Sequence, residues 1–514
     1  MKRLILCNDG TWNTPVQEEN GIPAPTNVVK LYHAVAASDE NGIEQRTYYH
    51  PGLGADGGLI DSIVGGAFGE GIDNHLRSAY YWLGTNYVPG DDIFIYGFSR
   101  GAFTARSLGG LIGRGLLDLR GLSSKEAWNR VGIAYDAYRQ ENRPPTSEWA
   151  KPDWAFFDSP NATPIRFLGV WDTVGALGIP DDLEILNLFD DKDKWRFHDT
   201  TLGQHVLTAR HAMAMDEIRA SFTVTRWDNA DSHRDAQEVW FPGVHSDVGG
   251  GYSNTELADG ALLWMLDESK TAGLRFRPGI LDLIKPNALG ALHNSYKGIF
   301  EKLRSRPRAM EALTPANKEL FHSSALDRQT TSPIAYAAYR PTRILEIGES
   351  LTIDIHADTH WNDAGLYLDH GHSYIFSATG EWLDGKEACD WKGTENSNFT
   401  AGDVIRATGT FLGKFETIVK NLTKNASTDF LGTKRVEQFP WFTLVGAIAN
   451  DSGVGSIVPN DGSPDPHQYV NLPDHTTDPL IVDNPGYLYC FPNDAWSMYD
   501  NNYGSVQLTI TRRA

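Results

Sequence analysis

The chain has 514 residues, of which 41% are hydrophobic, and its 66 acidic and 45 basic residues give a formal net charge of −21. Such an acidic surface repels phosphate groups, which disfavours nucleic-acid binding and electrostatic docking to anionic membranes. No stretch approaches the roughly 20 apolar residues that a membrane span needs. Because a single core rarely grows beyond roughly 250–300 residues, the length predicts more than one domain.

The first predicted element is a short buried strand around Leu4–Cys7. This run is too short for the apolar core of a signal peptide, so we expect a cytoplasmic protein, or one exported without a cleaved signal. The chain has three cysteines, at positions 7, 389 and 490. Such an odd and sparse set does not build a disulfide framework, although a bridge between Cys389 and Cys490 stays open.

Residues 1–275 alternate strand-like and helical patterns, which predicts an α/β-hydrolase-like catalytic domain with a mostly parallel sheet and helices on both faces. The strand-like runs are nearly continuous in apolar residues, as expected for strands covered on both sides. They are Arg3–Cys7, Gln45–His50, Asp92–Tyr96, Ile165–Val170 and Glu238–Phe241. The predicted helices are Gly71–Tyr87, Ser99–Leu116, Ser124–Glu141, Gly203–Met215 and Asp259–Ala272.

The residue pattern changes twice in the second half of the chain. Residues 276–340 carry weak helical patterns interrupted by prolines, and we interpret them as a peripheral helical segment, a linker or a lid. Residues 341–514 predict an all-β sandwich or jelly roll, because short strand-like runs alternate with Gly/Asn/Asp turns. These runs are Ser350–His356, Ser373–Thr379, Phe442–Ala447, Tyr487–Phe491 and Ser505–Thr511, whereas Asp403–Leu422 fits either helix or strand.

The strongest chemical signal is a Gly-x-Ser-x-Gly pentapeptide, Gly97–Gly101, between an apolar strand and an amphipathic helix. This is the setting of a nucleophile elbow, in which the serine stands on a sharp turn and its flanking glycines avoid clashes. We therefore expect Ser99 to be a nucleophile. A chance pentapeptide in a glycine-rich loop is the alternative, and the strand–helix context argues against it.

An oxyanion needs backbone donors close to the nucleophile. The amide of Arg100, directly after Ser99, is the first expected donor, aided by the positive end of the following helix. The second is expected from the loop after the first strand, where the Gly10 or Thr11 amide is the candidate. An ordinary Asp-Gly turn explains that loop equally well.

In this type of site an acid and then a histidine follow the serine along the chain. Asp172 lies just past the apolar strand that starts at Ile165, at the edge where α/β sheets place their sites. We predict that it is the triad acid. A helix cap or turn is the alternative role for it. Asp247 is a rival acid, ranked lower because it is only two residues from the expected histidine.

His245 is the expected base, because a strand ends shortly before it and three consecutive glycines, Gly249–Gly251, follow. Glycines in such a run suggest backbone pressed close to a substrate or to another loop. Other histidines are weaker rivals because they lack this strand-to-glycine setting; they are His50, His198, His205, His211 and His233.

Several motifs in order resemble the type VI secretion phospholipase effector-like α/β-hydrolases over about residues 1–275. They are Asp9–Asn13, Thr26–Leu31, Gly97–Arg106, Val170–Gly175, Met215–Glu217 and Phe241–Tyr252. The resemblance implies a Ser99–Asp172–His245 triad and hydrolysis of carboxylic esters, with phospholipids as substrates of the secreted effectors. The segment Met215–Arg219 matches the acidic segment of that family; we assign it no catalytic role and expect it to form a structural ion pair.

The C-terminal domain resembles the small calcium-dependent galactose-binding lectin of bacteria in three segments: Trp361–Leu366, Phe376–Trp382 and Asn493–Val506. The resemblance implies Ca²⁺ held by Asp494, Asn501 and Asn502 with the carbonyl of Met498, and a carbohydrate partner. Oxygen ligands of this kind suit Ca²⁺. The sequence departs from the lectin around its other ligand loop, and a polar β-loop is the alternative interpretation.

The leading hypothesis is therefore a serine esterase or lipase acting on lipid or phospholipid esters through an acyl-enzyme, with no cofactor required for catalysis. Two alternatives stay open. One is a carbohydrate-binding or adhesion protein with an ancillary or inactive hydrolase domain. The other is an esterase for acylated sugars or polyesters, which the aromatic content and the lectin-like domain keep in view.

Overall fold

The computed structural model describes residues 1–10, 13–52, 67–140, 142–175, 200–331, 337–394, 434–453 and 465–514. Thr11, His198 and the segment Asp403–Leu422 lie outside these ranges. The chain divides into two compact units, which we treat separately. The first contains Met1–Lys297 and Lys318–Ala335, and the second contains Gly298–Asn317, Tyr336–Val458 and Asp465–Ala514.

A six-stranded sheet forms the centre of the first unit, and every pair of neighbouring strands in it is parallel. In spatial order the strands are β4 (Gln45–His50), β1 (Arg3–Asn8), β5 (Asp92–Phe98), β6 (Ile165–Trp171), β7 (Ala209–Ala214) and β8 (Ala236–Phe241). The predicted mostly parallel α/β sheet is confirmed. All strands point the same way, so the loops that follow β5, β6, β7 and β8 emerge at one edge.

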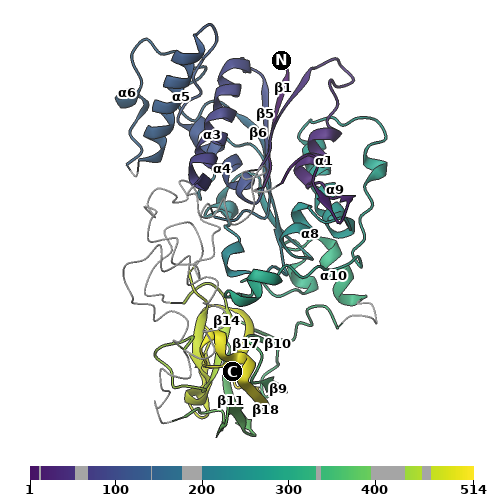
Figure 1. Ribbon diagram of the computed structural model, residues 1–514, viewed down its shortest axis with the longest axis vertical. Coiled ribbons are helices and arrows are strands. Elements are labelled where there is room, and N and C mark those ends of the chain that lie inside the picture. Colours follow the sequence, from purple (N-terminus) through teal and green to yellow (C-terminus); the bar gives the residue numbers. More distant parts are fainter. Residues whose placement is uncertain are drawn as a thin grey trace. The chain divides into compact units, whose positions relative to one another are not determined.

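Helices cover both faces of this sheet because side chains alternate along each strand. Leu4 and Leu6 of β1 pack with α3, α4 and α5, whereas Ile5 and Cys7 pack with α1 and α9 (Figure 1). The helices on the first face are α3 (Ala67–Asn86), α4 (Arg100–Gly113) and α5 (Ser124–Arg139), and those on the second are α1 (Asn27–Ala34) and α9 (Glu256–Thr271). Two-sided burial explains why the central strands β1, β5 and β6 are mostly apolar, whereas the edge strand β4 is rich in polar residues.

One predicted element is wrong. The stretch Gly203–Met215, expected to be helical, contains the strand β7 instead. Its two polar side chains broke the apolar pattern of a buried strand, yet both are paired: Arg210 contacts Asp235 at 2.8 Å and Glu268 at 2.7 Å, and His211 contacts Glu238 at 3.0 Å. This pairing offsets the cost of burying polar groups. The sequence of one strand does not show which partners other elements supply, so the pairing could not be predicted from it.

Shorter elements complete the first unit: β2 (Glu18–Glu19), β3 (Ile22–Pro23), α6 (Thr146–Trp149), α8 (His245–Gly249), α10 (Ser323–Thr330), η3 (Ala220–Phe222), η4 (Ala230–Ser232) and η5 (Leu281–Leu283). The predicted peripheral segment 276–340 includes η5 and α10, together with η6 (Gly298–Lys302) and η7 (Pro315–Asn317) of the second unit. Just before α10, Leu320 accepts from the Trp240 amide of β8 and the His322 amide donates to the Trp240 carbonyl, both at 2.9 Å. This contact attaches α10 to the edge strand of the sheet.

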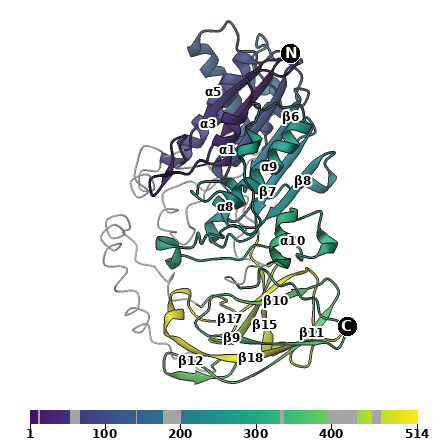
Figure 2. The same cartoon turned by 90° about the vertical axis from the view of Figure 1, so that its right-hand side faces the viewer.

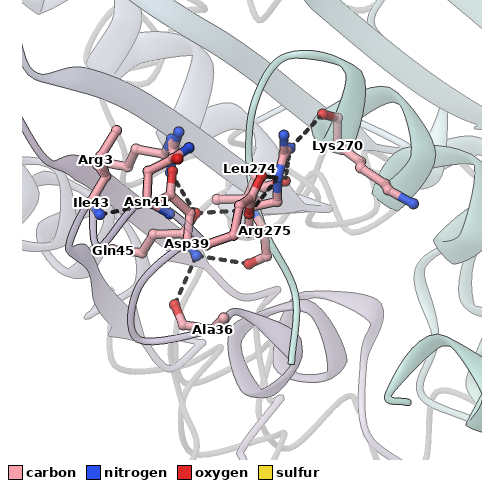
Figure 3. Close-up of polar contacts among 10 residues, drawn as sticks. Arg3, Ala36, Asp39, Asn41, Ile43, Gln45, Lys270, Leu274 and Arg275 are labelled. Carbon is pink, nitrogen blue, oxygen red and sulfur yellow. Dashed lines mark hydrogen bonds and ion pairs between the residues drawn. The ribbon is translucent and has the colours of Figure 1, made fainter. Parts of the chain in front are cut away.

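A polar network closes the opposite, amino-terminal edge of the sheet (Figure 3). The buried side chain of Gln45 donates to the carbonyls of Ala36 and Arg275 at 2.8 Å, and accepts from the Arg275 amide at 2.9 Å. Arg3 pairs with Asp39 at 2.9 Å. These bonds fasten the chain leaving α9 to the start of β4, away from the edge where the loops after β5–β8 emerge.

The second unit contains two antiparallel sheets, in agreement with the all-β prediction, while the jelly-roll topology stays a prediction. One sheet has the order β10 (Asn362–Leu368), β17 (Gly486–Pro492), β14 (Leu444–Ala449) and β15 (Gln468–Asn471). The other has the order β13 (Glu387–Cys389), β12 (Trp382–Asp384), β18 (Asn502–Arg512), β11 (Ser373–Thr379) and β16 (Leu480–Ile481), with β9 (Ser350–His356) paired to β18. Two 3₁₀ turns, η8 (Leu472–His475) and η9 (Trp496–Asn501), lie between strands.

Both sheets of this unit share one hydrophobic core, to which Leu366 and Leu488 come from the first sheet and Phe376 and Leu508 from the second. Figure 2 shows the strands of this unit with β18 as its longest. All three cysteines of the chain are free and buried, so the bridge left open between Cys389 and Cys490 does not form. Within the described residues, no helix combines the length and apolarity needed to cross a membrane.

Candidate active site

Ser99 stands at the junction between β5 and α4, as the elbow prediction requires. It caps the helix with φ 57° and ψ −124°, a strained backbone for a residue with a Cβ. Its amide donates to the Trp171 carbonyl at the end of β6 at 3.1 Å. The serine is thereby anchored beside the end of the neighbouring strand.

The two glycines of the pentapeptide are required by packing. A Cβ on Gly97 would overlap the carbonyl of Gly101, and a Cβ on Gly101 would overlap the carbonyl of Asn8 in β1. Helix α4 therefore starts against the backbone of β1 and β5 with no room for a side chain. The glycines let the chain turn abruptly and leave Ser99 at the turn.

Asp172 follows β6 directly and is fully buried. Its own φ is 37°, so this residue also sits on a sharp turn. One carboxylate oxygen, Oδ1, accepts from the Ala214 amide at the end of β7 at 2.8 Å. The other, Oδ2, contacts Nδ1 of His245 at 2.6 Å. The structure thus brings together the acid and the histidine that the sequence singled out.

His245 is the first residue of α8, a short helix that follows β8. Its ring lies 4.6 Å from the ring of Phe98, the neighbour of Ser99, and 5.0 Å from the ring of Phe222. Burial lowers the pKa of His245, and the Asp172 carboxylate opposes that shift. A neutral imidazole that donates through Nδ1 to Asp172 keeps Nε2 as its proton acceptor.

No hydrogen bond joins the Ser99 hydroxyl to His245 in the part of the chain that the structure describes. Two contacts link their neighbours: the ring of Phe98, the residue before Ser99, lies against the His245 ring, and the Ser99 amide donates to the carbonyl of Trp171, the residue before Asp172. Catalytic hydrogen bonds in substrate-free sites are often long and tighten only on substrate binding.

The expected oxyanion donors lie around Ser99. Arg100 is the first residue of α4, and Gly10 approaches so closely that a Cβ there would come within 3.2 Å of Ser99 Cβ. The Gly10 amide, however, donates to Oδ1 of Asp9 at 2.8 Å. It would have to release this carboxylate before it bound an oxyanion, and Thr11 lies outside the described residues.

The rival residues have other contacts. Asp247 accepts from Nδ1 of His293 at 2.5 Å and not from His245. His211 is fully buried, where its Nε2 accepts from the Thr173 amide at 3.1 Å, so it supports the turn that carries the acid. The remaining described rivals bond to backbone groups, with His50 contacting the Pro51 carbonyl, His205 the Gly109 carbonyl and His233 the Asp235 amide.

The glycine run after His245 is packed as the sequence suggested. A Cβ on Gly249 would overlap the ring of Phe98, and one on Gly250 would come within 2.7 Å of the Asn27 amide. Asn27, from the motif at the start of α1, also donates to the carbonyls of Val248 and Ala258 at 2.8 and 2.9 Å. Helix α1 therefore holds the histidine-bearing helix against α9.

Sequence reasoning missed how the acidic segment after β7 contributes to the site. Asp216 and Gly243 hold each other through two hydrogen bonds, one from each amide, at 3.0 and 2.7 Å. Glu217 accepts from the amide of His245 itself. The motif Met215–Glu217 was the available signal, but only the pairing of β7 with β8 explains why it faces the histidine loop.

The residues named as calcium ligands gather in the second unit. Asp494 accepts from Nδ2 of Asn502 at 2.9 Å, Asn501 donates to Asp384 at 3.3 Å, and Met498 belongs to η9 between them. Within the described residues, no group of three or more His, Cys, Asp or Glu side chains is placed to hold a metal. A cation here would therefore depend on amide and carbonyl oxygens as well as carboxylates.

The fold and the site together define an α/β protein whose buried Asp–His pair and strained serine share one edge of a parallel sheet. Residues 2–268, just over half of the chain, match the family model described as T6SS, phospholipase effector Tle1-like, catalytic domain, so the chain belongs to this family. The resemblance stated for the N-terminal part is confirmed. The match does not include the C-terminal unit, and the lectin resemblance of that unit gains no support from it.

The alignments with individual relatives cover only part of this chain and part of each relative. The uncharacterized protein YEL023C of Saccharomyces cerevisiae is 34% identical over 241 residues, which are 43% of this chain and 32% of the yeast protein. The crystal structure of an uncharacterized protein from Pseudomonas aeruginosa aligns with a TM-score of 0.36 and 19% sequence identity, over 56% of this chain and 49% of the Pseudomonas chain. The Tle1 effector bound to the VgrG spike of the type 6 secretion system aligns with TM-score 0.28 and 18% identity, over 49% and 52%. This chain thus spans about a third of the yeast relative and about half of each of these structures.

Proposed function

We propose that this protein is a serine hydrolase that cleaves carboxylic esters of lipids or phospholipids, with Ser99, His245 and Asp172 as its triad. The observation that carries the proposal is the 2.6 Å contact of buried Asp172 with His245, beside a serine held at φ 57°. Membership of a family named for phospholipase effectors supports a lipid ester as the substrate class.

In the proposed reaction the Ser99 hydroxyl attacks the ester carbonyl while Nε2 of His245 takes its proton. Asp172 holds the imidazole through Nδ1 and stabilises the imidazolium that forms. The Arg100 amide at the start of α4 holds the oxyanion, with a second amide from the loop after β1. His245 then protonates the leaving alcohol. In the second half of the reaction His245 takes a proton from water, the water attacks the acyl-enzyme, and His245 returns the proton to Ser99 as the fatty acid leaves.

Fluorophosphonate labelling followed by peptide mapping tests both the activity and the reacting residue. We expect the label on Ser99 and none on a Ser99→Ala variant, with phospholipid hydrolysis lost in that variant. Labelling at another residue, or near-normal ester hydrolysis by Ser99→Ala, would refute the triad. Preference for acylated sugars or polyesters over phospholipids would favour the esterase alternative. Calcium-dependent retention on a galactose matrix without labelling would favour the adhesion protein.

We also propose that the second unit binds Ca²⁺ through Asp494, Asn501, Asn502 and the Met498 carbonyl. Two buried carboxylates, Asp494 and Asp384, lie in the same cluster. Burial raises the pKa of Asp384 to about 7, helped by the charge of Asp494, and burial raises the pKa of Asp494 to about 6. The Oδ1 atom of Asn502 is buried without a hydrogen-bond partner, as a metal ligand would be.

A bound cation would stabilise the two carboxylates and would be coordinated by the Asn502 amide oxygen. Its role would be to hold the loop that contains Asp494 and Asn502, and it would take no part in ester hydrolysis. We expect CaCl₂ to raise the thermal unfolding temperature of the wild type above that in EGTA, and the Asp494→Asn variant to lose this increase. Equal unfolding temperatures in CaCl₂ and EGTA would refute the site. Galactose binding rests on the same cluster, and the galactose-matrix experiment decides it.

A further inference from the structure

The acidic segment after β7 contains an ion pair that contacts the proposed base. The carboxylate of Glu217 is 1% exposed and is bound by Arg219 three times: by Nη2 at 2.8 Å, by Nε at 2.9 Å and by the backbone amide at 2.9 Å. Ser295 donates its hydroxyl to the same carboxylate at 2.9 Å. A buried carboxylate needs such partners, because burial without them is costly.

This pair reaches His245 by two routes. The amide of His245 donates to Oε2 of Glu217 at 3.3 Å, which fixes the backbone from which the imidazole projects. The guanidinium of Arg219 lies 3.5 Å from the centre of the Phe222 ring, and this ring makes a T-shaped contact with the imidazole, with ring centres 5.0 Å apart. The pair therefore holds the histidine at its backbone and limits the movement of its ring.

The two charges act on the imidazole in opposite directions. Glu217 raises the pKa of His245 and Arg219 lowers it, in addition to the larger effects of burial and of Asp172. Glu217 and Arg219 also act electrostatically on the Tyr252 phenol, but burial raises the pKa of Tyr252, so it stays neutral in the working range. In the converse direction, the charge of Arg219 lowers the pKa of Glu217 against the effect of burial, so the carboxylate stays ionised.

We propose that Glu217 and Arg219 are positioning residues for His245: the carboxylate holds the histidine backbone, and the two opposite charges set the electrostatic balance around the imidazole. The proposal rests on the proposed function, in which His245 is the base. Its physical reason is that the imidazole must become positively charged when Ser99 attacks. A fixed negative charge close by favours that step, and a fixed positive charge opposes it.

Charge-removing variants test the balance. Glu217→Gln keeps an oxygen for the His245 amide but loses the charge, so the acidic limb of the pH profile of kcat/KM should move down by about 0.5 to 1 pH unit. Arg219→Gln should move it up by a similar amount, and the double variant should return it toward the wild-type position. Ser295→Ala is the matched control, because it removes a bond to the same carboxylate without changing any charge, and should leave the limb in place.

A second readout separates this inference from the proposed function. In the inactive Ser99→Ala background, the titration of His245 is followed by NMR with ¹³C-labelled histidine and assigned by comparison with a His245→Asn variant. A lower His245 pKa in Glu217→Gln and a higher one in Arg219→Gln support the inference even if Ser99 proves not to be the nucleophile. Unchanged titration in both, with wild-type unfolding temperatures, overturns it. If either variant is destabilised, Glu217→Asp provides a further test because it keeps the negative charge. Its pH profile of kcat/KM should keep the acidic limb at the wild-type position, and a shifted limb in this variant would also overturn the inference.

Discussion

Replacing Asp172 by asparagine should remove nearly all activity while leaving the fold in place, because the structure dictates how the amide would lie. Oδ1 of Asp172 accepts from the Ala214 amide at 2.8 Å, and this bond keeps an oxygen at that position. The NH₂ group of the asparagine then faces Nδ1 of His245, at the place where Oδ2 now lies 2.6 Å away. A donor there forces Nδ1 to accept, which puts the imidazole proton on Nε2.

A histidine protonated on Nε2 cannot take the proton of Ser99. In serine hydrolases with this constellation the wrong tautomer costs about 10³ to 10⁴ in kcat, or about 4 to 5.5 kcal/mol of activation free energy. We expect a loss of that size for Asp172→Asn in hydrolysis of a chromogenic ester, with KM changed little. Removing the Asp172 charge also removes a contribution that raises the pKa of His245, so higher pH should not restore the rate.

The matched control is Asp247→Asn, which changes the rival carboxylate two residues from His245. Asp247 pairs with His293 at 2.5 Å, and an asparagine keeps an oxygen that can accept from the Val244 amide at the start of α8, so the replacement should cost less than about tenfold in kcat. Thermal unfolding of both variants checks that each is folded. If Asp172→Asn keeps more than a tenth of the wild-type kcat, or if Asp247→Asn is the more damaging change, the reasoning about the triad acid is wrong.

Three further outcomes follow from the same contacts. First, burial lowers the pKa of His245, so the acidic limb of kcat/KM should lie below the ordinary histidine value of about 6.5, and a limb above that value would contradict the burial argument. Second, Asp247 raises the pKa of His293, so this pair should stabilise the fold fully below about pH 6.5 and less as the pH rises through the raised pKa. The difference in unfolding free energy between wild type and His293→Asn should therefore shrink at high pH, and a difference that does not change with pH would contradict the pairing. Third, Gln45→Ala should lower the unfolding free energy by about 2 to 3 kcal/mol in chemical denaturation, because it strips the bonds shown in Figure 3 from buried groups, with kcat unchanged in the folded enzyme.

The local signals in the sequence predicted local structure well. The bounds of β4, β9 and β11 agree with the predicted strands, because their composition and flanking turns identify them without reference to any partner. The elbow was also readable, since a strand, two obligatory glycines and a helix follow one another within a short stretch around Ser99. The failure at β7 shows the limit, because its arginine and histidine are acceptable in a buried strand only through partners in β8 and α9 or just before β8.

The sequence by itself determined the parallel α/β sheet, the turn at Ser99 and a ranked choice of acid and base. Only the tertiary structure decided which carboxylate meets the histidine, because Asp172 and His245 are 73 positions apart and are brought together by the register of β6, β7 and β8. It also decided that the Gly10 amide is bound by Asp9 and that Glu217 holds the histidine backbone. Side-chain chemistry can be read along a chain, but contacts between residues far apart depend on how the strands pair, and no local pattern contains that information.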